Sequence, residues 1–401
     1  MHPRRHAIRT YWRWPRGIKH VPPSHPEAGQ GSGLSASLVD STVRYVTNSD
    51  YHGWRLALRS LRANPPRSAA KGARAATFRA GLHQAEHLWA AGSAVGASAS
   101  PILLFYGLTQ AGRALCAAAG VPEGAESHGL EFKTRRPQTG SAIELSQVEI
   151  MQRGDGLAVR VADLLGSPLL AHAAPLSSLI AALDIQLAFG ETDLDPFRPL
   201  HAAGGESPSE VNPYQDAATG ELMLWPVPDA LIRREHVPAD GGRPGYTRQR
   251  PAPNEEFQAW LSHYPRLAAF GSPTHLGKIV ALPGSSPQIT VTWDVAVVDR
   301  SPKQIEWVRT AIDVIDPSPG QVLQGTILPA VGGNTAALHP LMGWWLVLYA
   351  LSMLARYYPG PWRASLDVDH SRTAVPLEHL LQSAATNVPT LVLQVLDELV
   401  H

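Results

Sequence analysis

The chain has 401 residues, of which 44% are hydrophobic, so it is long enough for two or three average domains or for one large domain with insertions. Its 34 Lys and Arg residues balance its 34 Asp and Glu residues, which excludes the global basic field of many nucleic-acid-binding proteins. Cys116 is the only cysteine, which excludes an internal disulfide and a cysteine-based zinc cluster and fits a reducing cytoplasm.

Residues 1–37 predict a disordered basic extension, because several arginines precede the first acidic residue, Glu27, and a Gly/Ser-rich hinge follows. This extension is either an arm that contacts RNA or a membrane surface, or a solvated tail. Residues 38–125 predict helices, among them a helical hairpin formed by 73–92 and 101–119. Pro101 suits the first turn of its second helix, and Gly120 suits the end.

The middle of the chain, 126–337, predicts strands. The segments 141–151 and 156–165 alternate apolar and polar residues around "QRGDG", which predicts a β-hairpin. A helix is expected at 176–189, and the Val- and Ile-rich runs 277–284 and 287–299 predict strands. Residues 190–285 otherwise predict long connections around short elements.

Two further helices are expected at 340–357 and 376–398. The sequence therefore predicts a single α+β domain over 38–401. In it the helical parts 38–125 and 338–401 form a bundle, and the β-containing middle is an insertion. The apolar run 341–355 is too short to span a bilayer, so we expect a soluble cytoplasmic protein without membrane contact.

Polar side chains follow a line on helices that are otherwise apolar. On a helix, Tyr106, Gln110 and Arg113 lie within about 60° of one another. Tyr349 and Arg356 lie on a second such line, and Glu86 on an earlier helix is expected to neutralise Arg113 or Arg356. Two interpretations remain open: a pocket for a phosphate or carboxylate, or a buried network that fixes helix register.

Two further segments carry candidate residues. His128 precedes the basic Lys133 and Arg135, which either bind phosphates or form a solvated loop. Arg372 and His379 flank the start of the last helix. Carboxylates and histidines in 367–381 lack the H-x-x-x-H and H-E-x-x-H spacings, so we expect no metal site and no cofactor.

Several blocks resemble the YaaC-like family of bacterial proteins: "ATFRAGLHQAEHLWAAGSAVGASASPILLFYGLTQAGRALCAAAG", "HGL", "HPLMGWWLVLYALSMLARYYPGPW" and "AVPLEHLLQSAATNVPTLVLQVL". The resemblance covers about residues 40–165 and 338–398. It implies lineage more than function, because no biochemical activity of the family can be carried over.

At the superfamily level, "LFYGLTQAGRAL" followed by His128 is similar to the helical bundles of HEPN proteins. HEPN ribonucleases use an R-x4-6-H motif, in which the arginine holds the scissile phosphate and the histidine assists proton transfer, usually across a dimer. Arg372 and His379 match that spacing, but Thr373 stands where the motif has another polar residue and Pro376 interrupts it.

Two classes of function follow. The first is a non-catalytic nucleotide- or RNA-binding module in stress or phage-defence regulation, which binds through the lines of arginines. The second is a metal-independent ribonuclease or phosphodiesterase, in which Arg372 or Arg113 holds phosphate and His379 or His128 transfers protons. A homodimer is expected if the last helices expose an apolar face.

Overall fold

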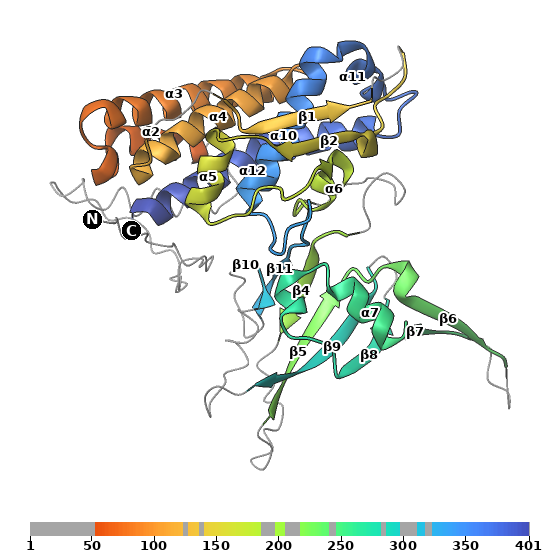
Figure 1. Cartoon of the computed structure of the whole chain (residues 1–401). Coiled ribbons are helices and arrows are strands. Elements are labelled where there is room, and N and C mark those ends of the chain that lie inside the picture. Colours follow the sequence, from red (N-terminus) through yellow and green to blue (C-terminus); the bar gives the residue numbers. More distant parts are fainter. Residues whose placement is uncertain are drawn as a thin grey trace, which may run out of the picture. The chain divides into compact units, whose positions relative to one another are not determined.

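A computed structural model describes residues 53–122, 127–135, 140–185, 197–204, 217–239, 246–281, 286–296, 311–316 and 323–400. These residues form two compact units. The first holds the described residues up to 185 and from 338 onward, and the second holds those from 197 to 337. Helices dominate the first unit and antiparallel strands the second (Figure 1), which confirms a mixed α+β fold.

This division is finer than the single domain expected over 38–401, and the part of the β-containing middle up to residue 185 belongs to the first unit. The predicted basic extension 1–37 lies outside the described residues.

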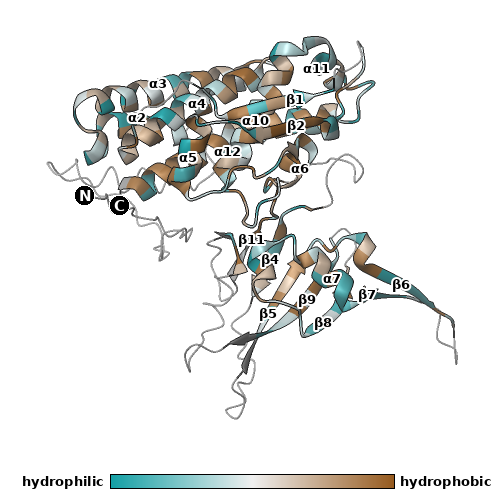
Figure 2. Cartoon of the chain, in the orientation of Figure 1, coloured by the Kyte–Doolittle hydropathy of each residue, from teal (hydrophilic) through white to brown (hydrophobic). Residues whose placement is uncertain are grey.

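Helices from both ends of the sequence pack together in the first unit. The helix α4 contacts α3, α5, α10 and α12, and hydrophobic residues run along α10 and α12 (Figure 2). The helices here are α2 (Gly53–Ala63), α3 (Gly72–Ala94), α4 (Ser100–Ala119), α5 (Leu157–Leu165), α6 (Leu176–Ala181), α10 (Pro340–Tyr357), α11 (Pro359–Ser365) and α12 (Ala374–Val400), with 3₁₀ turns η1 (Arg67–Ala69) and η2 (Leu145–Gln147).

Close packing around α4 depends on glycines that face large rings. A Cβ on Gly107 would lie 2.5 Å from Cδ1 of Trp89, and one on Gly112 would overlap the ring of Trp345. By length and composition α4 could cross a membrane, but 67% of its apolar window is buried within the structure. Burial against the neighbouring helices accounts for its hydropathy.

A three-stranded antiparallel sheet, in the order β1 (Leu130–Thr134), β2 (Val148–Gln152) and β3 (Ala174–Pro175), belongs to the first unit. The predicted hairpin of 141–151 with 156–165 is wrong, because β2 pairs with β1 and Leu157–Leu165 is the helix α5. In that segment Leu157, Val161 and Leu165 are buried at helical spacing, and this period prevails over the short alternation.

The second unit is built on a six-stranded antiparallel sheet in the order β10-β11-β4-β5-β9-β8. Phe257, Trp260 and Leu267 belong to the same hydrophobic core as the inward side chains of β5 and β9. The predicted strands at 277–284 and 287–299 correspond to β8 and β9. The elements are β4 (Leu200–Gly204), β5 (Ala217–Trp225), η3 (Asp229–Leu231), β6 (Ile232–Val237), β7 (Tyr246–Pro251), α7 (Asn254–Leu261), α8 (Pro265–Ala268), β8 (His275–Val280), β9 (Gln288–Ala296), β10 (Val314–Asp316) and β11 (Leu323–Ile327).

Candidate functional site

His128 sits in a tight backbone crossing just before β1. Gly129 has φ +75°, a conformation that favours glycine. The backbone of Gly156 passes so close that a Cβ on Gly156 would overlap the backbone nitrogen of Gly129. The amide of Ala158 in the first turn of α5 donates to the carbonyl of His128 at 3.2 Å. The "HGL" sequence and the glycine before α5 therefore fix His128 in place.

The imidazole of His128 packs against two aromatic rings from distant parts of the sequence. Its centroid lies 5.3 Å from that of Phe105 on α4 and 5.9 Å from that of Tyr349 on α10. The Tyr349 hydroxyl donates to the carbonyl of Leu130 at 3.1 Å, which connects α10 to β1. Burial raises the pKa of Tyr349 despite the nearby charge of Arg356, so its hydroxyl remains a donor.

Arg356 binds two phenol groups rather than a carboxylate. Its Nη1 donates to the Tyr106 hydroxyl at 2.7 Å and its Nη2 donates to the Tyr357 hydroxyl at 2.6 Å. The guanidinium carbon lies 5.9 Å and 4.8 Å from the centroids of the same two rings. Because these partners are neutral, the positive charge of Arg356 is not compensated by them.

Arg113 is exposed on α4, and among the described residues it has no hydrogen-bond or ion-pair partner. Burial, followed by the charges of Arg356 and Arg113, lowers the pKa of His128 below its ordinary value. The two arginines, predicted from separate helical lines, therefore both act electrostatically on His128. We call these five residues the arginine–histidine cluster: Tyr106, Arg113, His128, Tyr349 and Arg356.

The nearby strand β1 adds charges that largely neutralise one another. Glu131 lies 3.0 Å from Nη1 of Arg153 and 3.9 Å from Nζ of Lys133. Lys133 also contacts the sulfur of Met151 at 3.3 Å. Arg135 is exposed just after the strand. Glu131, whose charge acts on Tyr349 of the cluster, thus has basic partners of its own.

The expectation that Glu86 neutralises Arg113 or Arg356 is wrong. Glu86 is only 2% exposed and accepts from Nε of Arg59 at 2.7 Å, and it lies 2.8 Å from Nη2 of Arg62. Both partners belong to α2, which carries a basic line of its own. The spacing of basic residues in "RLALRSLR" was the signal that could have indicated them.

The other predicted residues lie on separate parts of the first unit. Gln110 is half-buried on α4, one turn from both Tyr106 and Arg113. Arg372 is exposed in the turn before α12, and His379 is exposed on α12 itself. Their proposed catalytic role stays a prediction.

The described part of the chain holds neither a metal-binding cluster nor a reactive thiol. It holds no group of three or more His, Cys, Asp or Glu side chains arranged to hold a metal ion. Burial raises the pKa of Cys116 to about 11, so this cysteine stays a thiol in the core at neutral pH.

The fold and the cluster define an α+β protein in which α4 and α10 bring two arginines, neither paired with a carboxylate of the described residues, to a half-buried histidine just before β1. The family described as YaaC-like protein matches residues 44–192 and 319–396, more than half of the chain, so the chain belongs to the YaaC-like family. No curated protein and no solved structure matches it.

Proposed function

We propose that this YaaC-like protein binds a phosphate-bearing ligand, a nucleotide or RNA, at the arginine–histidine cluster. The observation that carries the proposal is the charge balance. Arg113 has no partner within the described residues, and Arg356 is bonded to neutral hydroxyls. Guanidinium groups fit phosphate oxygens in a bidentate geometry, so two of them without a carboxylate favour such a ligand.

Aromatic rings beside the arginines support a ligand that carries a base. Tyr357 is 59% exposed and stacks on Arg356 at the end of α10. The ring of Tyr358 lies 6.2 Å from that of Phe132 on β1. Bases stack on tyrosine and phenylalanine with little dependence on sequence, and positive groups next to such rings are typical of single-stranded nucleic-acid binding.

The binding mode proposed here is that of a HEPN-like helical module without catalysis, acting in the cytoplasm in stress or phage-defence regulation. A homodimer is part of the proposal. Val368, in the turn before α12, and Val375, in the first turn of α12, are 61% and 56% exposed, and a second copy would cover them. Light scattering coupled to size exclusion tests this, with Val375→Lys expected to give a monomer.

The alternative is a metal-independent ribonuclease or phosphodiesterase. The lowered pKa of His128 favours it, because this imidazole is neutral at pH 7 and able to accept a proton beside groups that hold phosphate. Arg372 and His379 are the second candidate pair, through the R-x4-6-H spacing.

One experiment separates the two functions. Labelled single-stranded RNA and common nucleotides are titrated with the protein, with and without EDTA, and the reaction is checked for product. Binding without product, weakened about tenfold in Arg113→Ala and unchanged in Arg74→Ala, supports the module. Arg74 is the matched control, because it is another exposed arginine without a partner in the described chain.

Cleavage that survives EDTA and is lost in His128→Ala, or in Arg372→Ala or His379→Ala, supports the enzyme instead. Equal binding by the parent protein and Arg113→Ala, without cleavage, contradicts both functions at this site.

A further inference from the structure

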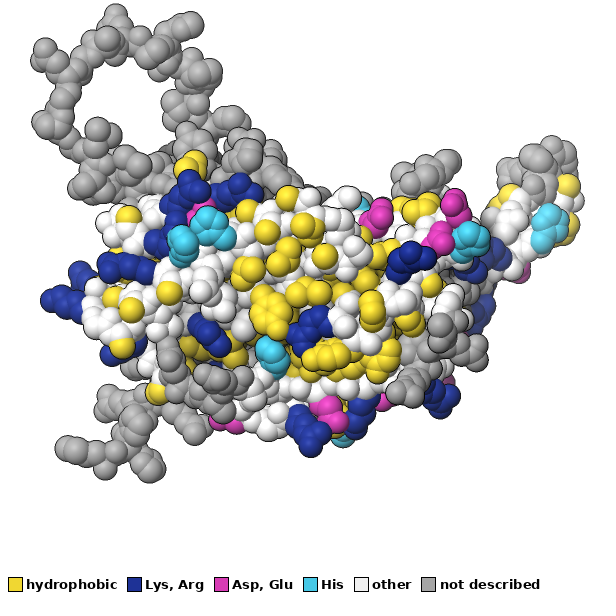
Figure 3. Space-filling view, turned by 90° about the horizontal axis from the view of Figure 1, so that it is seen from above, with side chains coloured by type: hydrophobic (Ala, Val, Ile, Leu, Met, Phe, Trp, Pro, Cys, Tyr) yellow, Lys and Arg dark blue, Asp and Glu magenta, His cyan; other side chains and the backbone are white. Residues whose placement is uncertain are grey.

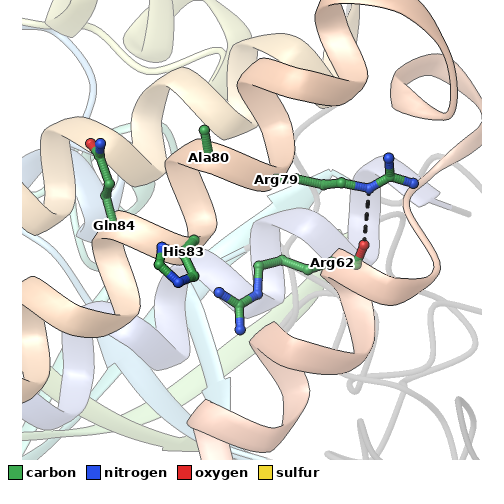
Figure 4. A pocket seen from close by; sticks show the side chains of 5 residues that line it. All are labelled: Arg62, Arg79, Ala80, His83 and Gln84. Atoms are coloured by element: carbon green, nitrogen blue, oxygen red, sulfur yellow. Dashed lines mark hydrogen bonds between the residues drawn. The ribbon is translucent and has the colours of Figure 1, made fainter.

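A second basic surface lies on α2 and α3 and includes none of the residues of the arginine–histidine cluster. An open pocket of about 410 Å³ is lined there by Arg62 from α2 and by Arg79, Ala80, His83 and Gln84 from α3 (Figure 4). Lys and Arg side chains gather beside histidines at this end of the helical face (Figure 3). Neither the family match nor the proposed function assigns a role to this pocket.

Glu86 lies beneath this surface and sets its charge. It binds both Arg59 and Arg62 through its two oxygens, at 2.7 and 2.8 Å, and is almost completely buried. One carboxylate thus faces two guanidinium groups, and Arg79 adds a third positive charge. The carboxylate holds the Arg62 side chain against α3 and leaves the pocket with an excess of positive charge.

The pocket residues have hydrogen-bond donors to spare. Nη1 of Arg62 is buried and has no partner in the described part of the chain. Arg79 donates through Nε to the backbone carbonyl of Arg62 at 3.3 Å, which leaves its two terminal nitrogens for a ligand. His83 and Gln84 are exposed and add an imidazole and an amide.

A bound cation is disfavoured at the same place. His83 and His87 stand one turn apart on α3, with ring centroids 4.5 Å apart, a spacing at which two imidazoles can share a metal ion. The described residues offer no third ligand beside them. The guanidinium groups of Arg62 and Arg79 also repel a divalent cation, so the chemistry favours an anion.

We propose that the pocket lined by Arg62, Arg79, His83 and Gln84 is a second oxyanion site, which takes a phosphate group. The pocket is an open hollow of about 410 Å³, so a phosphate bound there leaves the group esterified to it exposed to solvent. Free nucleotides and the RNA backbone share this chemistry. The site goes beyond the proposed function, because it uses none of the cluster residues.

The test is isothermal titration calorimetry in an Arg113→Ala background, which removes one of the two arginines of the first site. The probes are inorganic pyrophosphate, AMP and a short single-stranded RNA. Adding Arg79→Ala is expected to weaken binding about tenfold, whereas adding Arg74→Ala on the same helix leaves it unchanged within about twofold. Both arginines are exposed, so both variants are expected to fold, and thermal melting checks this.

A loss seen with pyrophosphate and AMP assigns the site to free nucleotides, and a loss seen only with RNA assigns it to the RNA backbone. Equal affinities of the Arg79→Ala and Arg74→Ala proteins for every probe, or no binding at all, overturn the second site. Because Arg113 is replaced in both proteins that are compared, any binding that remains at the arginine–histidine cluster is the same in both, and only the pocket on α2 and α3 differs.

Discussion

Replacing Glu86 by alanine is expected to destabilise the first unit by about 3 kcal/mol. The carboxylate is 2% exposed, and the side chain of Arg62 beside it is only 18% exposed. Removing one partner of a buried ion pair leaves an uncompensated charge and costs about 3–5 kcal/mol. The other partner, Arg59, is 58% exposed, so water replaces its lost contact and its share is below about 1 kcal/mol.

Urea unfolding followed by far-ultraviolet circular dichroism measures this loss, because the helical signal comes mainly from the first unit. Arg59→Ala is the matched control and is expected to cost less than about 1 kcal/mol. If Glu86→Ala costs no more than Arg59→Ala, Glu86 does not hold a buried charge in place, and the reasoning about the α2–α3 surface fails with it.

Four further outcomes are expected. Arg113→Ala raises the pKa of His128 toward its ordinary value in an NMR titration, because one of the charges that disfavours its protonation is gone. An unchanged pKa would show that the charge of Arg113 does not act on His128. In the parent protein the unfolded state binds this proton more readily, so the contribution of His128 to stability falls as pH drops below about 6.5, and calorimetry at several pH values measures it. Tyr349→Phe removes the hydroxyl's bond to the β1 backbone and costs about 1 kcal/mol in urea unfolding, an effect absent if solvent replaces the bond. Gly112→Ala forces a methyl group against the ring of Trp345 and costs about 1–3 kcal/mol; a melting temperature equal to the parent's would contradict the close packing of α4 on α10.

The helices of the first unit were predictable because their apolar positions repeat at helical spacing. The predicted helices 73–92 and 340–357 correspond to Gly72–Ala94 and Pro340–Tyr357. The segment 156–165 was misread, because a run of ten residues fits both a strand and a helix. Its predicted partner in the hairpin was 141–151. The strand found there, Val148–Gln152, instead pairs with Leu130–Thr134, which lies earlier in the chain.

Part of the cluster was predictable from polar residues on apolar helices. The predicted polar lines on α4 and α10 contain Tyr106 and Arg356, and these two side chains do meet. Nη1 of Arg356 donates to the Tyr106 hydroxyl at 2.7 Å. The spacing of its arginines indicates a basic line on α2, but no local spacing encodes the tertiary contact of α2 with α3 that makes Arg59 and Arg62 the partners of Glu86. Tyr357 was missed because it lies off the line, next to Arg356 in sequence, and binds it only where α10 ends.

The salt dependence of RNA binding tests the central claim most directly. For single strands, the logarithm of the binding constant falls with the logarithm of salt concentration by about 0.7 for each phosphate contacted. We predict that Arg113→Ala lowers this slope by about 0.7 relative to the parent protein, while Arg74→Ala leaves it unchanged. Identical slopes for the parent and Arg113→Ala would show that no phosphate is held at the arginine–histidine cluster.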